Sequence, residues 1–122
     1  MFSGAHVILY SRDAEADRAF IRDVLGLAHV DAGEGWLIFA LPPAELAVHP
    51  TDGEPTDGEP KAEFYLMCED IEGLMARLRA DGVSCGPVTD QGWGLLGSVL
   101  LPSGADLAIY EPRHPLAHDL PG

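Results

Sequence analysis

The sequence predicts an α+β fold built from two similar modules, each with the element order β-α-β-β-β. Three observations support this: the order occurs twice along the chain, residues 41–50 resemble residues 101–112 with small gaps, and 47% of the 122 residues are hydrophobic. An internal repeat indicates two equivalent structural units, and this hydrophobic content is sufficient for a core. At this length we expect one domain over residues 1–122, with module one at 4–50 and module two at 62–112.

Module one opens with a strand-like run at residues 5–10, in which polar and apolar side chains alternate. A helix is expected after residues 11–13, because acidic side chains occupy its first turn and Gly26 is a suitable C-cap. One face of this helix carries apolar residues four positions apart, namely Phe20, Ile21, Val24 and Leu25. Glycine and proline turns then separate three expected strands, at residues 27–30, 36–40 and 45–49.

Module two repeats this order. Residues 62–68 are strand-like, and residues 70–81 form an amphipathic pattern that ends before Gly82. The inward face of this helix is predicted to carry Ile71, Leu74, Met75 and Leu78. Three further strands are expected at residues 86–89, 94–101 and 106–111.

The segment between the modules, residues 51–61, contains Thr-Asp-Gly-Glu-Pro twice in tandem. Four acidic residues, two glycines and no apolar side chain cannot form a core, so we interpret it as a solvated, mobile linker. A flap that closes over a ligand is the alternative. Residues 113–122 are interpreted as a proline-rich tail that is frayed.

The charge of the chain excludes several classes of partner. Twenty acidic residues against seven basic ones give a formal net charge of -13, which would repel nucleic acid and anionic membrane surfaces. No secretory signal or membrane-spanning apolar run is visible, and two cysteines make no disulfide framework. We therefore expect a cytoplasmic protein whose partner is a neutral or cationic small molecule.

The paired modules resemble the vicinal oxygen chelate superfamily, which includes glyoxalases, bleomycin-resistance proteins and extradiol dioxygenases. The resemblance covers residues 4 to about 112. It rests on the repeat, the opening strand with His6, Asp-Val-Leu-Gly-Leu at 23–27 and Leu-Pro-Ser-Gly-Ala-Asp-Leu at 101–107. It implies curved mixed sheets that enclose a cleft, with the helices outside, and it implies a homodimer. Whether the modules pair within one chain or across a swapped dimer stays open.

Strand alternation then predicts which side chains line the cleft. The cleft face is expected to carry His6, Ile8, Tyr10, Glu45, Ala47, His49, Glu63, Tyr65, Met67, Asp106, Ala108 and Tyr110. The opposite face is apolar and is expected to pack under the helices; it carries Val7, Leu9, Leu46, Val48, Phe64, Leu66, Cys68, Leu107 and Ile109. All three tyrosines of the chain fall on the cleft face.

The resemblance also implies four metal-ligand positions, one on the first and last strand of each module. Two of them hold His6 and Glu63, but the other two hold Ala47 and Ala108, which have no donor atom. We therefore expect no cofactor. The alternative is a divalent metal held by His6, His49 and Glu63, a two-histidine, one-carboxylate set typical of non-haem iron.

From these residues we predict a protein that binds a small molecule without a metal and is similar to the bleomycin-resistance branch of the superfamily. Ligand-binding candidates are Tyr10, Glu45, His49, Tyr65, Asp106 and Tyr110, with carboxylates attracting a cation and tyrosines stacking on a ring. The alternative is a divergent lyase, isomerase or dioxygenase in which His6 and Glu63 are catalytic. A third possibility is an interaction module with a vestigial cleft, since histidine and tyrosine also occur as ordinary sheet residues. The ligand itself is not identified by the sequence.

Overall fold

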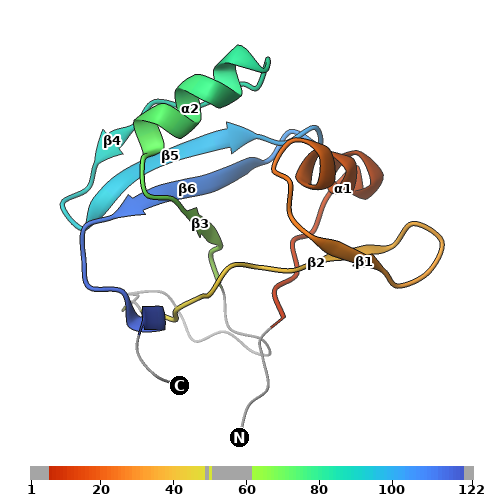
Figure 1. Ribbon diagram of the computed structural model, residues 1–122, viewed down its shortest axis with the longest axis horizontal. Coiled ribbons are helices and arrows are strands. Elements are labelled where there is room, and N and C mark those ends of the chain that lie inside the picture. Colours follow the sequence, from red (N-terminus) through yellow and green to blue (C-terminus); the bar gives the residue numbers. More distant parts are fainter. Residues whose placement is uncertain (1–5, 49, 51–61, 120–122) are drawn as a thin grey trace, which may run out of the picture.

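The structure is a computed structural model that describes residues 6–48, 50 and 62–119. Two helices and strands in two sheets confirm the α+β class (Figure 1). The elements are α1 Ala14–Asp23, β1 His29–Asp31, β2 Leu37–Phe39, β3 Tyr65–Met67, α2 Ile71–Ala80, β4 Thr89–Asp90, β5 Gly94–Leu100, β6 Asp106–Pro112 and the 3-10 helix η1 Ala117–Asp119. No helix in these ranges is long and apolar enough to cross a membrane.

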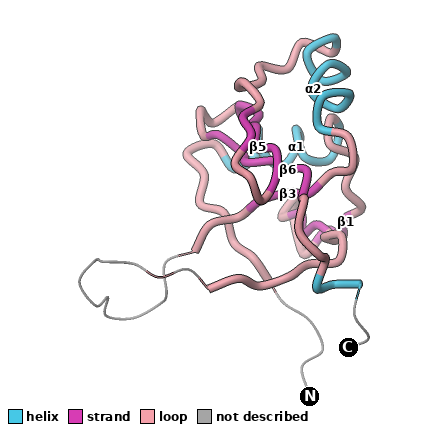
Figure 2. Tube along the Cα trace, turned by 90° about the vertical axis from the view of Figure 1, so that its left-hand side faces the viewer, coloured by secondary structure: helices cyan, strands magenta, loops and turns pink. Residues whose placement is uncertain are grey.

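Module two forms a four-stranded sheet in the order β3-β6-β5-β4. The β3 and β6 strands are parallel, while β5 runs antiparallel to both β6 and β4. The parallel pair sets Tyr65 opposite Ala108 and Met67 opposite Tyr110, so Tyr65 and Tyr110 lie on the same face of the sheet. Helix α2 lies along the other face (Figure 2).

The hydrophobic core lies between α2 and this sheet. Its buried members are Ile71, Met75, Leu78, Val99, Leu101, Leu107 and Ile109. Gly97 on β5 allows the helix to approach closely, because a Cβ atom there would lie 3.0 Å from the Met75 methyl carbon. The predicted inward positions of β6 are confirmed, since Leu107 and Ile109 are both buried.

Both helices begin and end where the sequence predicts. The side chains of Asp13 and Asp70 accept hydrogen bonds from first-turn backbone N–H groups, at 3.2 and 3.1 Å. Gly26 and Gly82 follow the helices with φ values of +71° and +87°, a conformation that favours glycine. The capping aspartates and the glycines that follow the helices therefore set the helix limits that the sequence predicts.

Two expected strands of module one are wrong in the described part of the chain. Residues 6–10 and 45–48 are irregular, and within the described part of module one only β1 and β2 pair, as an antiparallel two-stranded sheet. Val7, Leu9, Leu46 and Val48 were expected under the helices but are exposed, Leu46 by 90%. Alternation predicts the face of a strand, but a strand also needs a neighbour for its backbone hydrogen bonds, and residues 6–10 and 45–48 have no strand partner among the described residues.

The second module shows smaller shifts of boundary. The strand expected at residues 86–89 is the short β4 at Thr89–Asp90, and Cys85 makes an isolated bridge to Val99. His49 and the predicted linker at 51–61 lie outside the described residues, so the linker and flap interpretations stay predictions.

Candidate functional site

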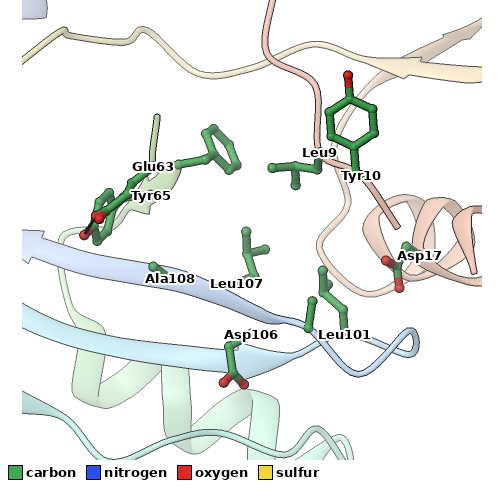
Figure 3. A pocket seen from close by; sticks show the side chains of 11 residues that line it. Leu9, Tyr10, Asp17, Glu63, Tyr65, Leu101, Asp106, Leu107 and Ala108 are labelled. Carbon is green, nitrogen blue, oxygen red and sulfur yellow. Dashed lines mark hydrogen bonds between the residues drawn. The ribbon is translucent and has the colours of Figure 1, made fainter. Parts of the chain in front are cut away.

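A pocket of about 340 Å³ lies between the N-terminal segment, the start of α1, β3 and the start of β6 (Figure 3). Its lining residues are Leu9, Tyr10, Asp17, Glu63, Phe64, Tyr65, Leu101, Ala105, Asp106, Leu107 and Ala108. Residues from both modules therefore contribute to it.

The lining combines an apolar interior with acidic side chains. Leu9 and Leu107 point into the pocket from opposite sides (Figure 3). Glu63 and Asp106 are both exposed, so their carboxylates remain in contact with solvent. Figure 3 shows the Asp106 side chain directed away from Leu9 and Leu107, and the Glu63 carboxylate beside the Tyr65 hydroxyl at one edge of the pocket. Such a pocket suits a molecule with an apolar, ring-sized body that displaces water and a positive charge that lies at the rim, near the carboxylates.

Glu63 holds the Tyr65 side chain in place on one wall of the pocket. Its hydroxyl donates a hydrogen bond to the Glu63 carboxylate. This hydrogen bond, burial and the negative charge of Glu63 all raise the pKa of Tyr65 above its ordinary value. The phenol therefore stays protonated at neutral pH, so Tyr65 contributes a neutral aromatic side chain to the pocket lining.

Asp17 is the one buried charged side chain of the described residues, with 6% of its surface exposed. Ser11 Oγ and Ser103 Oγ each donate to it at 2.7 Å, and the Ser103 N–H donates at 3.0 Å. Burial raises the pKa of Asp17, but the three hydrogen bonds outweigh it and hold the pKa below 3.8. Asp17 is thus ionised at neutral pH and joins α1 to the turn between β5 and β6.

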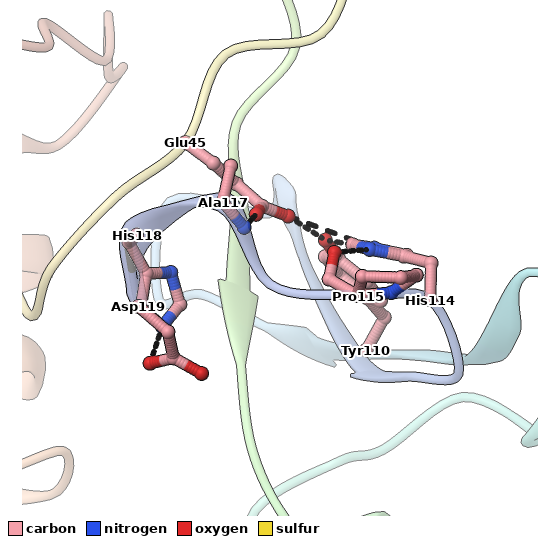
Figure 4. A network of polar contacts seen from close by, with 7 residues as sticks. All are labelled: Glu45, Tyr110, His114, Pro115, Ala117, His118 and Asp119. Carbon is pink, nitrogen blue, oxygen red and sulfur yellow. Dashed lines mark hydrogen bonds and ion pairs between the residues drawn. The ribbon is translucent and has the colours of Figure 1, made fainter. Parts of the chain in front are cut away.

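A second polar cluster lies beside the pocket, around Tyr110 (Figure 4). The Tyr110 hydroxyl donates to Glu45 at 3.3 Å and lies 3.3 Å from His114 Nε2. The Tyr110 ring packs edge-on against Tyr65, with 5.7 Å between centroids, which connects the cluster to the pocket wall. Burial, followed by the charge of Glu45, raises the pKa of Tyr110, so this phenol is also a donor.

The structure thus divides the residues that the sequence singled out. Tyr10, Glu63, Tyr65 and Asp106 line the pocket, whereas Glu45 and Tyr110 belong to the adjacent cluster. Tyr10 lies in an irregular segment and is 90% exposed, so it does not share a strand face with the other two tyrosines. His6 is exposed and does not line the pocket, and His49 lies outside the described residues.

Only part of the metal-ligand set implied by the resemblance has donor atoms in this chain. Ala47 and Ala108 offer no donor atom at two of the four positions. Among residues 6–48, 50 and 62–119, no three His, Cys, Asp or Glu side chains lie close enough together to hold an ion. The four positions implied by the resemblance therefore do not form a complete ligand set. The alternative set of His6, His49 and Glu63 includes a residue outside the described part of the chain, so it stays a prediction.

Two residues of the site were missed in the sequence. The burial of Asp17 could have been predicted from its position. It lies three residues before Phe20 and four before Ile21, and so falls on the apolar face of its helix. A charged residue on such a face indicates a buried, hydrogen-bonded carboxylate. The position of His114 gave no such indication, because it lies in a segment interpreted as a frayed tail.

Cys68, which directly follows β3 and packs against the core, gives a testable prediction. Burial, with smaller contributions from the charges of Glu111 and Asp70, raises the pKa of its thiol from 9.0 to about 11. In a Cys85→Ser variant near pH 8 we expect iodoacetamide to modify Cys68 about a hundredfold more slowly than it modifies free cysteine, because little thiolate is present. The same variant in urea is the control. Equal rates in the folded and unfolded protein would show that the thiol is not held in this environment.

Comparison with solved structures shows the same fold in several proteins. TnmS3, an antibiotic binding protein from Streptomyces sp. CB03234, is 22% identical with a TM-score of 0.60, over 93% of this chain and 100% of that one. Lactoylglutathione lyase from Agrobacterium tumefaciens is 19% identical with a TM-score of 0.63, over 89% of this chain and 93% of that one. An integron cassette protein from the mobile metagenome of the Halifax Harbour sewage outfall is 19% identical with a TM-score of 0.60, over 90% of this chain and 99% of that one.

A search of curated protein sequences gives no match. Comparison with protein-family models, in contrast, matches residues 4–113 to the Glyoxalase/Bleomycin resistance protein/Dioxygenase superfamily. This match covers nearly the whole chain and agrees with the α+β fold and its solved neighbours. The chain belongs to the Glyoxalase/Bleomycin resistance protein/Dioxygenase superfamily.

Proposed function

We propose that the protein binds a small aromatic molecule carrying a positive charge in the pocket between the N-terminal segment and β6. The molecule is held without a metal and is released unchanged, so the protein acts by sequestration. The alternative in which His6 and Glu63 catalyse a reaction gains no support from the described residues, because His6 does not line the pocket.

The observation that carries this proposal is an apolar interior with the exposed carboxylates of Glu63 and Asp106 at its edge. Leucine and phenylalanine side chains supply a surface for a ring, and the aromatic rings of Tyr10 and Tyr65, at the border of the pocket, favour a cation over an anion. The net charge of -13 adds a long-range field of the same sign, which would raise the local concentration of cations.

The fold alone does not choose between binding and catalysis. An antibiotic binding protein and a lactoylglutathione lyase both have it, which agrees with the rule that function depends on the site rather than on the scaffold. Here the side chains favour binding, since they supply carboxylates and aromatic rings but no gathered metal donors among the described residues.

The test is calorimetric titration with 4-aminoquinolinium, a flat cation, and with 1-naphthoate, an anion of similar size. We expect the cation to bind and the anion to bind at least about tenfold more weakly, because the carboxylates repel it. Replacing Glu63 with Gln keeps an acceptor for the Tyr65 hydroxyl but removes the charge. This change is expected to weaken cation binding about fivefold, an effect that falls with added salt.

Glu72→Gln provides the matched control. Glu72 is exposed in the first turn of α2, outside the pocket, and its replacement changes the net charge by the same amount. Equal binding of the two probes, or equal effects of the two substitutions, would contradict the proposed role of Glu63.

A further inference from the structure

The C-terminal segment of the described chain, residues 113–119, folds back and is fastened to Glu45 (Figure 4). The backbone N–H of Ala117 donates to Glu45 Oε2 at 2.8 Å. On the other carboxylate oxygen, Glu45 Oε1 accepts from the Tyr110 hydroxyl and lies 3.6 Å from His114 Nε2. The Glu45 side chain is only 14% exposed, so these partners replace most of the water that would otherwise contact its carboxylate.

The segment also covers an aromatic surface. The His114 ring is tilted by 32° over Tyr110, at 6.0 Å between centroids. Tyr65 and Trp93 pack against the same ring at 5.7 and 5.3 Å. As a result, only 8% of Tyr110 is exposed, although it lies on the sheet face turned away from α2.

The orientation of the His114 ring is set by its own backbone. Its Nδ1 lies 2.8 Å from the Pro115 carbonyl, an acceptor, so Nδ1 carries a hydrogen. The other nitrogen, Nε2, is thereby directed toward the Tyr110 hydroxyl and Glu45. A flat nitrogen-containing ring thus lies against a tyrosine, with a nitrogen directed at a carboxylate.

We propose that Tyr110 and Glu45 form a second part of the binding site, for an aromatic ring with a cationic or N–H donor group. Residues 113–119 occupy this part as an internal competitor, and the ligand must displace them. The inference rests on the proposed function, since Tyr65 lines the pocket and also contacts Tyr110, which makes the two parts continuous. In the absence of ligand, the His114 ring occupies the position of the ligand ring against Tyr110. The Ala117 N–H occupies the position of the ligand's donor group on Glu45.

The Ala117→Pro substitution removes the hydrogen bond that holds residues 113–119 to Glu45 without changing a residue of the proposed site. Proline lacks the N–H that reaches Glu45 but is tolerated at the first position of a helical turn, and Ala117 begins η1. Glu45 and Tyr110 remain unchanged in this variant. Ala117→Ser keeps the N–H and serves as the matched control.

Release of the segment can be measured without any ligand, by limited trypsin digestion. Arg113 is half-exposed and immediately precedes His114, so cleavage between them reports opening of the segment. We expect cleavage there to be about fivefold faster in Ala117→Pro, as for the loss of one hydrogen bond of ordinary net strength, with Ala117→Ser unchanged. Cleavage at Arg77 in α2 should not change, which shows that the fold is intact.

Binding of 4-aminoquinolinium, measured by calorimetry, decides whether segment and ligand share the site. Ala117→Pro should bind the cation about fivefold more tightly, because a larger fraction of the protein has the site open. Glu45→Gln should also speed cleavage at Arg113 but should weaken cation binding, since it removes the carboxylate itself.

The possible failures are distinguishable. If Ala117→Pro accelerates cleavage but leaves cation affinity unchanged, the segment is not a competitor and this inference is wrong, while the proposed function stands. If Ala117→Pro does not accelerate cleavage, the fastening to Glu45 does not hold the segment and the inference is also wrong. If neither the wild type nor any variant binds the cation, the proposed function fails and the inference fails with it.

Discussion

Replacing Ile109 with Ala is expected to lower the free energy of unfolding by about 3 kcal/mol. Ile109 is 2% exposed and lies on β6, the strand that pairs with both β3 and β5. Its side chain packs in the core under α2, where truncation loses the burial of methyl and methylene groups and leaves a cavity. Urea unfolding followed by far-ultraviolet circular dichroism measures the change.

Leu100→Ala is the matched control for this prediction. Leu100 ends the neighbouring strand β5, but 44% of it is exposed, so the same kind of truncation should cost under about 1 kcal/mol. The slope of the unfolding free energy against urea should be the same for both variants. Equal destabilisation by the two substitutions would mean that the core does not lie where the structure puts it.

Replacing Asp17 with Ala is expected to destabilise the fold by about 2 kcal/mol. Three donors, the hydroxyls of Ser11 and Ser103 and the Ser103 N–H, lose their shared acceptor, the buried carboxylate of Asp17. The loss also separates α1 from the turn between β5 and β6, which lies 86 residues away in the sequence. Ser103→Ala removes one of the three donors and should have a smaller effect.

The contribution of Asp17 should depend on pH in a defined direction. Its pKa is lowered in the folded state relative to the ordinary 3.8, so its stabilising effect is fully present above that value. The effect is lost as the pH falls below 3.8 through the folded-state pKa, because the carboxylate then takes up a proton. We expect the difference in unfolding free energy between wild type and Asp17→Asn to shrink over this range. A difference that stays constant with pH would contradict the assignment.

The sequence predicted those parts of the fold that depend on local interactions. Both helices were found within a few residues, because Asp13 and Asp70 cap their starts and Gly26 and Gly82 follow their ends. The strands β5 and β6 were also found with nearly their predicted boundaries. They are joined by a short turn with Gly104 at positive φ, so the pairing of neighbouring strands follows from the chain itself.

The errors fall on segments whose state depends on distant partners. Residues 6–10 and 45–48 have strand-like alternation but remain unpaired in the described chain. Alternation identifies which side chains would share a face, but a strand forms only when another strand completes its hydrogen bonds. For the same reason the predicted cleft wall of module one could not be placed from the sequence, and Tyr10 is separated from the sheet face that carries Tyr65 and Tyr110.

The sequence by itself determined the α+β class, the helix limits, the inward face of β6 and the family resemblance. Each of these follows from residues close together in the chain or from the repeated pattern. Only the tertiary structure decided how the candidate site is arranged. Asp17 meets Ser103, Glu45 meets Tyr110 and Glu45 meets Ala117 across 86, 65 and 72 positions. Periodicity has no information over such separations, since these hydrogen bonds depend on how the core packs and not on the spacing of residues.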